Sequence, residues 1–153
     1  MLSQTSEYAL RAMVHLADQP NTPRTARQIA DITKVPPRYL SKVLQALAGA
    51  GLIEARRGVG GGFTLTRPLK KISVLDVVNV VEPIRRIERC PLGLRGHVKL
   101  CPLHQRIDEA ISMIETAFER VSLHELVNTQ GGSKPLCEST GRRNKAALTV
   151  GRT

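Results

Sequence analysis

Apolar residues recur every three or four positions in several short stretches of the chain, which is the pattern of amphipathic helices. The first predicted helix spans Ser6–Asp18 and ends before Pro20. A second helix spans 26–32 with Thr25 as its N-cap, and a third spans 38–50. The first fifty residues therefore predict three short helices in succession.

A pair of strands is predicted after the third helix. Leu52–Arg56 and Phe63–Thr66 flank a glycine-rich stretch over 57–62, which is typical of a hairpin with a Gly-rich tip. We expect the glycines to allow positive φ and close approach to another surface at positions 58, 60, 61 and 62. Because the glycines lie between two strands, the phosphate-binding loops of nucleotide-binding folds are not expected here.

The second half of the chain has a different pattern. The composition of 72–81 also suits a strand, but a fourth helix is favoured there because Ser73 can cap it together with Asp76. Residues 82–101 look irregular, whereas 102–121 is compatible with a helix throughout. The apolar residues of that helix repeat at spacings of four and three, a seam that can pair with a partner helix. They are Ile107, Ile111, Ile114, Phe118 and Val121.

The charge of the chain narrows the choice of partner. Lys and Arg total 23 against 13 Asp and Glu, a formal net charge of +10, which favours nucleic acid. Three helices followed by a hairpin is also the order of a winged helix-turn-helix, whose third helix enters the major groove of DNA. The fold class that we predict is mainly α with a small β-hairpin wing, a winged helix-turn-helix plus a long dimerisation helix.

Polar residues lie where such a fold meets DNA. On the third helix they lie off the apolar face, and on the hairpin they lie at the wing. The expected DNA-binding residues are Arg38, Ser41, Lys42, Gln45, Arg56, Arg57 and Gly60. The alternative is an ordinary solvated surface. We expect the basic residues to contact phosphates, and the bases to be read by Ser41 and Gln45.

Three cysteines, at 90, 101 and 137, are too few for a secreted disulfide framework, which leaves metal binding, redox chemistry or idle thiols. Cys101 precedes Pro102, a favoured first residue of a helix, so the helix dipole favours its thiolate. His104 follows about one turn later on the same face. Thiolates with imidazoles suit an iron–sulfur cluster or zinc.

The stretches 6–11 (SEYALR) and 52–63 (LIEARRGVGGGF) resemble the family of IscR, NsrR and RirA. Its members are dimeric winged-helix repressors, many of which hold an iron–sulfur cluster. The resemblance covers about residues 1–127, and its most specific parts are the RRGVGGGF wing and the cysteine segment before a long helix. It implies that the third helix reads DNA and that 102–121 forms the dimer interface.

The cysteine segment departs from the family pattern. Members that bind clusters usually have three cysteines there, whereas this chain has Cys90 and Cys101, with His97 near the place of the missing one. The resemblance implies a ligand set of these two cysteines and His104, completed by His97 or by Glu7 from the other subunit. A 2Fe–2S cluster is favoured, with 4Fe–4S as an alternative, and zinc or no metal as further alternatives.

Together these patterns predict a dimeric, sequence-specific regulator, a repressor of an operator in double-stranded DNA that senses redox, nitric oxide or iron status. Two alternatives stay open. One is a regulator of the same fold without a cluster, which senses thiol oxidation, zinc, a small molecule or a partner protein. The other is a non-specific nucleic-acid architectural protein.

Other classes of protein are not expected. The sequence has no HExxH, GxSxG or comparable catalytic motif, so we do not expect an enzyme. It has no apolar run of roughly 20 residues and no N-terminal signal pattern, so we expect no membrane association and a cytoplasmic location. The expected division is a DNA-binding domain over 1–81, a sensor loop over 82–101, a dimerisation helix and a short C-terminal helix over 102–130, and a disordered basic tail over 131–153.

Overall fold

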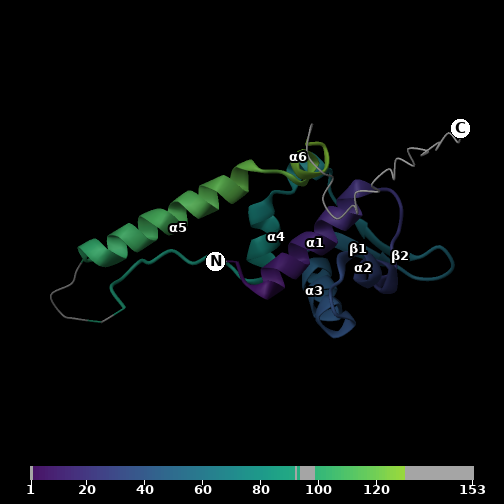
Figure 1. The fold of residues 1–153 in the computed structure, drawn as a ribbon, viewed down its shortest axis with the longest axis horizontal. Helices are drawn as coiled ribbons and strands as arrows, with labels where there is room; N and C mark the ends of the chain where they lie inside the picture. Colours follow the sequence, from purple (N-terminus) through teal and green to yellow (C-terminus); the bar gives the residue numbers. More distant parts are fainter. Residues whose placement is uncertain (1, 92, 94–98, 130–153) are drawn as a thin grey trace, which may run out of the picture.

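A computed structural model describes residues 2–91, 93 and 99–129 of the chain. The elements follow one another as α1 (Gln4–Asp18), α2 (Ala26–Thr33), α3 (Pro37–Gly49), β1 (Ile53–Arg56), β2 (Gly62–Leu65), a 3-10 turn η1 (Leu69–Lys71), α4 (Val74–Val81), α5 (Pro102–Arg120) and α6 (Leu123–Val127). The described residues form a mainly helical fold with one antiparallel hairpin, which confirms the predicted fold class (Figure 1). The predicted tail over 131–153, with Cys137, lies outside the described residues.

Local capping accounts for where the first helices begin. Helix α1 starts at Gln4, two residues before the predicted start, because the hydroxyl of Ser3 accepts a hydrogen bond from the Ser6 N–H at 3.2 Å. Thr25 caps α2 as predicted, in a reciprocal capping box with Gln28. Pro37 is the first residue of α3, where its missing N–H costs nothing.

The hairpin is shorter than predicted at its open end, while at its tip β2 begins one residue earlier than predicted, at Gly62. Its register pairs Ile53 with Leu65 and Arg56 with Gly62, so Leu52 and Thr66 lie outside the strands. The glycine prediction was right at 58, 60 and 62, which have positive φ, but wrong at Gly61, which does not. Gly61 is required for space instead, because a Cβ there would lie 2.3 Å from the carbonyl oxygen of Arg56.

The hairpin is also joined to the helical part of the chain. Phe63 of β2 donates its N–H to the carbonyl of Arg24 at 2.7 Å and accepts from the Arg24 N–H at 3.1 Å. This bridge fixes the base of the wing to the loop between α1 and α2. Gly62 lies against the same loop, where a Cβ would come within 2.6 Å of the Arg24 backbone. The wing therefore has a fixed base and a free tip.

The stretch after the hairpin is helical, as the capping pattern predicted. Ser73 accepts from the Asp76 N–H and the Asp76 carboxylate accepts from the Ser73 N–H, which closes a capping box at the start of α4. Just before α4, the carbonyl of Ile72 accepts from the Leu123 N–H at 2.9 Å. Leu123 is fully buried, so α6 returns to the body of the molecule and completes its core.

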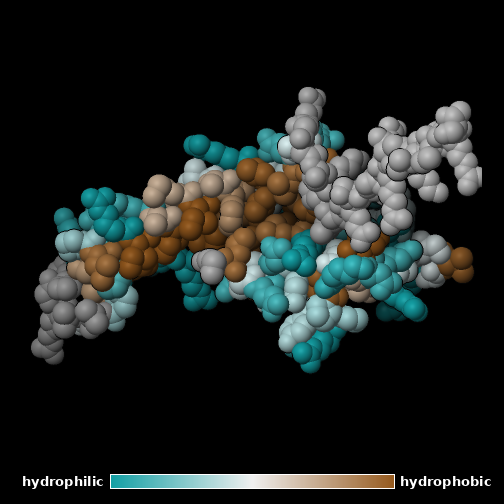
Figure 2. All heavy atoms as spheres, viewed as in Figure 1, coloured by the Kyte–Doolittle hydropathy of each residue, from teal (hydrophilic) through white to brown (hydrophobic). Residues whose placement is uncertain are grey.

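The hydrophobic core lies between α1, α2, α3, α4 and α6, and the start of the hairpin adds to it. The predicted inner face of α3 is confirmed, with Leu40, Val43, Leu44 and Leu47 all buried. Helix α5 contributes no buried residue and extends away from this body (Figure 1). Figure 2 shows an apolar band along it. The exposed large apolar residues of α5 are Leu103, Ile107, Met113 and Ile114.

The described residues between α4 and α5 have no helix or strand, as predicted for 82–101. We call residues 82–91 the connecting segment.

No helix in the described part of the chain is long and apolar enough to cross a membrane.

Candidate nucleic-acid interface and metal centre

The outer face of α3 presents the four side chains that the sequence pattern singled out. Arg38, Ser41, Lys42 and Gln45 are all exposed, while the opposite face of the helix is buried. The Ser41 hydroxyl donates to the carbonyl of Pro37 at 3.0 Å and keeps its lone pairs free to accept. This face can offer hydrogen-bond donors and acceptors to phosphates and base edges.

An aromatic pair at the start of α3 was not anticipated. The guanidinium of Arg38 lies 4.7 Å from the ring centroid of Tyr39 and donates to its hydroxyl at 3.2 Å. The Tyr39 ring lies 6.1 Å from that of Tyr8 on α1. These contacts restrain Arg38 before any ligand binds. Sequence reasoning missed the pair because neither tyrosine lies in an apolar repeat.

The wing carries the remaining candidates for DNA contact. Arg56 donates to Glu54 on the same strand at 2.8 Å, and both side chains are largely exposed. Arg57 follows at the beginning of the tip and is exposed. Gly60 has a φ of 74°, a conformation that only glycine adopts freely. The wing can therefore bring two arginines and a bare backbone to one surface.

Two cysteines and a histidine form a separate group at the start of α5. The Nδ1 atom of His104 lies 3.2 Å from the Sγ of Cys101 and 3.7 Å from the Sγ of Cys90. One ligand atom from each of the three residues lies within 4.8 Å of the others. Cys90 is only 7% exposed, and Cys101 is partly exposed.

Local structure explains two members of this group. Cys101 is the N-cap residue of α5 and Pro102 its first residue, which confirms the predicted helix start. The Cys101 carbonyl accepts from the Gln105 N–H at 2.9 Å, so the cysteine is held at the first turn. His104 is on that turn and reaches back to the Cys101 sulfur. Cys90 joins them from a distant point in the sequence.

The donor set fits a metal or an iron–sulfur cluster chemically. Two thiolates and an imidazole are soft and borderline ligands, which suit zinc and iron–sulfur centres. Three ligands leave room for a fourth. The sequence analysis named His97 and Glu7 for that role. His97 lies outside the described residues. Glu7 is exposed on α1, where it pairs with Arg11 at 2.9 Å, and it is not part of the group within one chain.

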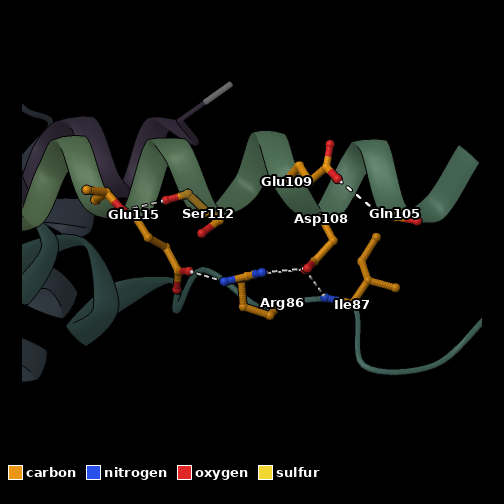
Figure 3. A network of polar contacts seen from close by, with 8 residues as sticks. Arg86, Ile87, Gln105, Asp108, Glu109, Ser112 and Glu115 are labelled. Carbon is orange, nitrogen blue, oxygen red and sulfur yellow. Dashed lines mark hydrogen bonds and ion pairs between the residues drawn. The ribbon is translucent and has the colours of Figure 1, made fainter. Parts of the chain in front are cut away.

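A polar network next to this group was also not anticipated (Figure 3). Asp108 on α5 accepts from Nε and Nη2 of Arg86 at 2.8 and 2.5 Å, and from the N–H of Ile87 at 2.8 Å. Arg86 also lies 3.6 Å from the carboxylate of Glu115. The connecting segment is thereby attached to α5 at a second place. In the sequence, the spacing of four residues between His104 and Asp108 indicates only that the two side chains lie on one face of α5.

The network shifts the pKa values of Asp108 and Arg86. The hydrogen bonds from Arg86, followed by the bond from the Ile87 N–H, lower the pKa of Asp108 from 3.8 to about 2. The bond to Asp108 raises the pKa of Arg86 further above its usual value. Both groups are therefore ionised at any physiological pH.

Comparisons with known proteins agree with this architecture. Residues 2–129 match the family model of Rrf2, described as an iron-dependent transcriptional regulator. Two solved structures resemble the chain at 23% identity over 82% of it. They are IscR of T. potens, with a TM-score of 0.70 over 85% of that chain, and CymR (YrzC), the global cysteine regulator of B. subtilis, with 0.71 over 95%.

At that identity the two structures support the fold alone, but the family model covers most of the sequence. It agrees with the resemblance noted from the wing and the cysteine segment, and it describes regulators rather than enzymes. The chain belongs to the Rrf2 family of transcriptional regulators.

Proposed function

We propose that this regulator is a dimeric, sequence-specific repressor that reports redox, nitric oxide or iron status through an iron–sulfur cluster, with a 2Fe–2S cluster favoured. The observation that carries the proposal is the group of Cys90, Cys101 and His104, whose ligand atoms lie within 4.8 Å of one another. Residues 14 positions apart in the sequence meet there, next to the start of the long helix.

The DNA-binding part of the proposal rests on α3 and the wing. Arg38 and Lys42 on α3, with Arg56 and Arg57 on the wing, supply the positive charge for phosphates, and all four are exposed. Ser41 and Gln45 supply polar groups for base edges. The overall charge of +10 favours association with a polyanion.

The dimer part of the proposal rests on α5. A groove of about 440 Å³ lies between α5, the start of α1 and the connecting segment, and its apolar lining includes Ile111, Ile114 and Phe118. Next to this groove α5 also exposes Ile107. Large apolar side chains on one face of a helix favour association with another apolar surface. The heptad-like spacing suits a second copy of the same helix.

The position of the metal group suggests how a signal reaches DNA. Cys90 belongs to the connecting segment and Cys101 to the start of α5, so a group bound by both joins the two segments. A bound cluster supplies redox and nitric-oxide reactivity at this junction. Because α5 carries the proposed dimer contact, the junction can influence how far apart two recognition helices lie. That distance must match successive major grooves.

A second candidate function is sensing without a cluster. The described group contains two cysteines, and its donor set also fits zinc. CymR of B. subtilis, whose fold matches as well as that of IscR, is named as a cysteine regulator. The oxidised form of Staphylococcus aureus CymR also matches, with a TM-score of 0.68 and 22% identity. That match covers 84% of this chain and 96% of the other. Zinc binding or thiol oxidation at Cys90 and Cys101 is the alternative.

Anaerobic reconstitution with iron and sulfide tests the proposal. The wild type should take up iron and acid-labile sulfide and gain visible absorbance, while Cys90→Ala and Cys101→Ala should lose most of both. Cys137→Ala is the matched control and should behave as the wild type. A wild type without acid-labile sulfide, or full retention in both alanine variants, contradicts the cluster and favours zinc or thiol chemistry.

A further inference from the structure

We infer that Asp108 is a positioning residue, which together with Arg86 and the N–H of Ile87 holds the connecting segment against α5 and so places Cys90 beside Cys101 and His104. The consequence for metal binding rests on the proposed function. The positioning itself concerns the metal-free chain and can be tested there.

The three bonds to Asp108 lie close to the metal group along both segments. On α5, Asp108 follows His104 by four residues, which puts the two side chains on one face about 6 Å apart along the axis. On the connecting segment, Ile87 precedes Cys90 by three residues, so at full extension the chain can separate them by only about 10 Å. Fixing Ile87 at Asp108 therefore confines Cys90 to the neighbourhood of His104.

Side-chain acceptors hold the connecting segment at two places in the described part of the chain. Residues 82–91 have no helix or strand to fix their path. Near the start of the segment, the Ile84 N–H donates to the side chain of Asn79 at 3.1 Å. Further on, the Ile87 N–H donates to Asp108 at 2.8 Å. Loss of the second acceptor should release the half of the segment that carries Cys90.

The geometry at Asp108 is specific rather than a loose attraction between charges. One carboxylate oxygen accepts from Nε of Arg86 and from the Ile87 N–H, and the other accepts from Nη2 of Arg86. Such a two-pronged guanidinium–carboxylate contact fixes direction as well as distance. The Asp108 side chain is 16% exposed. Its lowered pKa, about 2, keeps it charged, so this attachment does not depend on physiological pH.

The expected effect is local. Exposed ion pairs add little to the stability of a whole protein, and Arg86 is 44% exposed. The folded core lies elsewhere, between α1, α2, α3, α4 and α6. Removal of the Asp108 carboxylate should therefore make Cys90 more accessible without unfolding the body of the molecule.

The test measures alkylation of each cysteine by iodoacetamide in the full-length, metal-free, reduced protein, with peptide mass spectrometry as the readout. In Asp108→Ala the rate at Cys90 should rise about tenfold, while the rate at Cys101 should change little. Asp108→Asn should fall between, because its amide oxygen still accepts from the Ile87 N–H but lacks the charge that holds Arg86. It also serves as the second variant if the alanine variant folds poorly.

Glu109→Gln is the matched control. It removes a neighbouring carboxylate of α5 that pairs with Arg106 at 2.9 Å and makes no bond to the connecting segment in the described network. Its alkylation rates should equal those of the wild type. An unchanged Cys90 rate in both Asp108 variants, or an equal acceleration of Cys90 and Cys101, would overturn the inference, since the second result indicates general loosening.

Binding of Co²⁺ to the metal-free protein gives a second readout, through the absorbance of its thiolate complex. Asp108→Ala should bind Co²⁺ about tenfold more weakly than the wild type, and Glu109→Gln should bind it equally well. A wild type that binds neither Co²⁺ nor a cluster contradicts the proposed function, while the alkylation rates still decide the role of Asp108. If Asp108→Ala binds Co²⁺ as tightly as the wild type but its Cys90 is alkylated faster, Asp108 positions Cys90 only in the metal-free protein. That result would overturn the link between Asp108 and metal binding.

Discussion

Helices α1 and α5 show how differently the two parts of this molecule are held. Helix α1 has 15 residues, of which eight are buried, whereas α5 has 19 and none is buried. The body around α1 completes its hydrophobic core within one chain. Helix α5 leaves its apolar side exposed and is joined to the connecting segment by ion pairs and by the Cys/His group. The body therefore has a hydrophobic core of its own, while α5 keeps large apolar side chains at the surface.

The largest expected effect concerns the exposed side of α5. Ile111→Glu with Ile114→Glu should convert the proposed dimer entirely into monomers, because it places two charges in the apolar seam. Sedimentation of the double variant checks this. Val59→Glu, which changes an exposed apolar residue at the wing tip, is the control and should remain dimeric. A dimeric double variant would show that the seam is assigned wrongly.

The next largest effect compares truncations in the two regions. Leu47→Ala empties a fully buried position and should lower the free energy of unfolding by about 2–5 kcal/mol. Ile107→Ala on α5, made in the monomeric double-Glu background, should change it by less than about 0.5 kcal/mol. Urea denaturation followed by circular dichroism measures both. Equal losses would mean that α5 belongs to the core after all.

A smaller effect concerns the wing, which should matter for DNA and not for the dimer. Arg56→Ala with Arg57→Ala should weaken operator binding and flatten the slope of log affinity against log salt by up to about two units. Titration of an operator selected from random-sequence DNA at several salt concentrations measures this. Lys70→Ala with Lys71→Ala removes the same charge outside α3 and the wing and should leave the slope nearer the wild-type value. Unchanged affinity in the arginine variant would remove the wing from the interface.

The same titration separates a regulator from an architectural protein. A sequence-specific repressor should prefer its operator over random DNA by at least about 1,000-fold. Comparable affinity for both would favour non-specific binding, whatever the role of the wing.

The smallest expected effect lies inside the body. Burial lowers the pKa of His15, and the charge of Arg24 lowers it further, against an opposing contribution from Asp18. As pH falls, His15 is therefore protonated in the unfolded chain before it is protonated in the folded protein. The stabilisation that comes from a neutral His15 is complete above pH 6.5 and is lost as pH falls through the lower pKa of the folded state. His15→Gln should flatten the stability profile between about pH 7 and 5. An unchanged slope in His15→Gln would assign this pH dependence to other groups.

Several features of this protein were predictable because they depend on neighbours within one helical turn. Thr25 and Ser73 each cap a helix with a partner three residues later, and Pro102 begins α5. The inner face of α3 followed from its repeat. Even there α1 begins two residues before the predicted start, because Ser3 caps it by accepting from the Ser6 N–H.

The candidate site was predictable in part. Cys101 and His104 lie one turn apart, so their proximity is a local property of α5. The approach of Cys90 is not, because it depends on the path of an irregular segment. That path is fixed by Asp108, 21 positions from Ile87, and no periodicity relates the two.

The order of the elements, most of their caps, the exposed polar face of α3 and the glycine tip of the wing could be inferred from the chain, since each follows from local hydrogen bonding or from periodic burial. Three features required the folded molecule: Cys90 meets His104, Arg86 and Asp108 join the connecting segment to α5, and α5 extends from the core with apolar side chains exposed. Contacts between distant segments depend on chain direction through irregular residues, where backbone dihedrals are selected by long-range partners and not by neighbours.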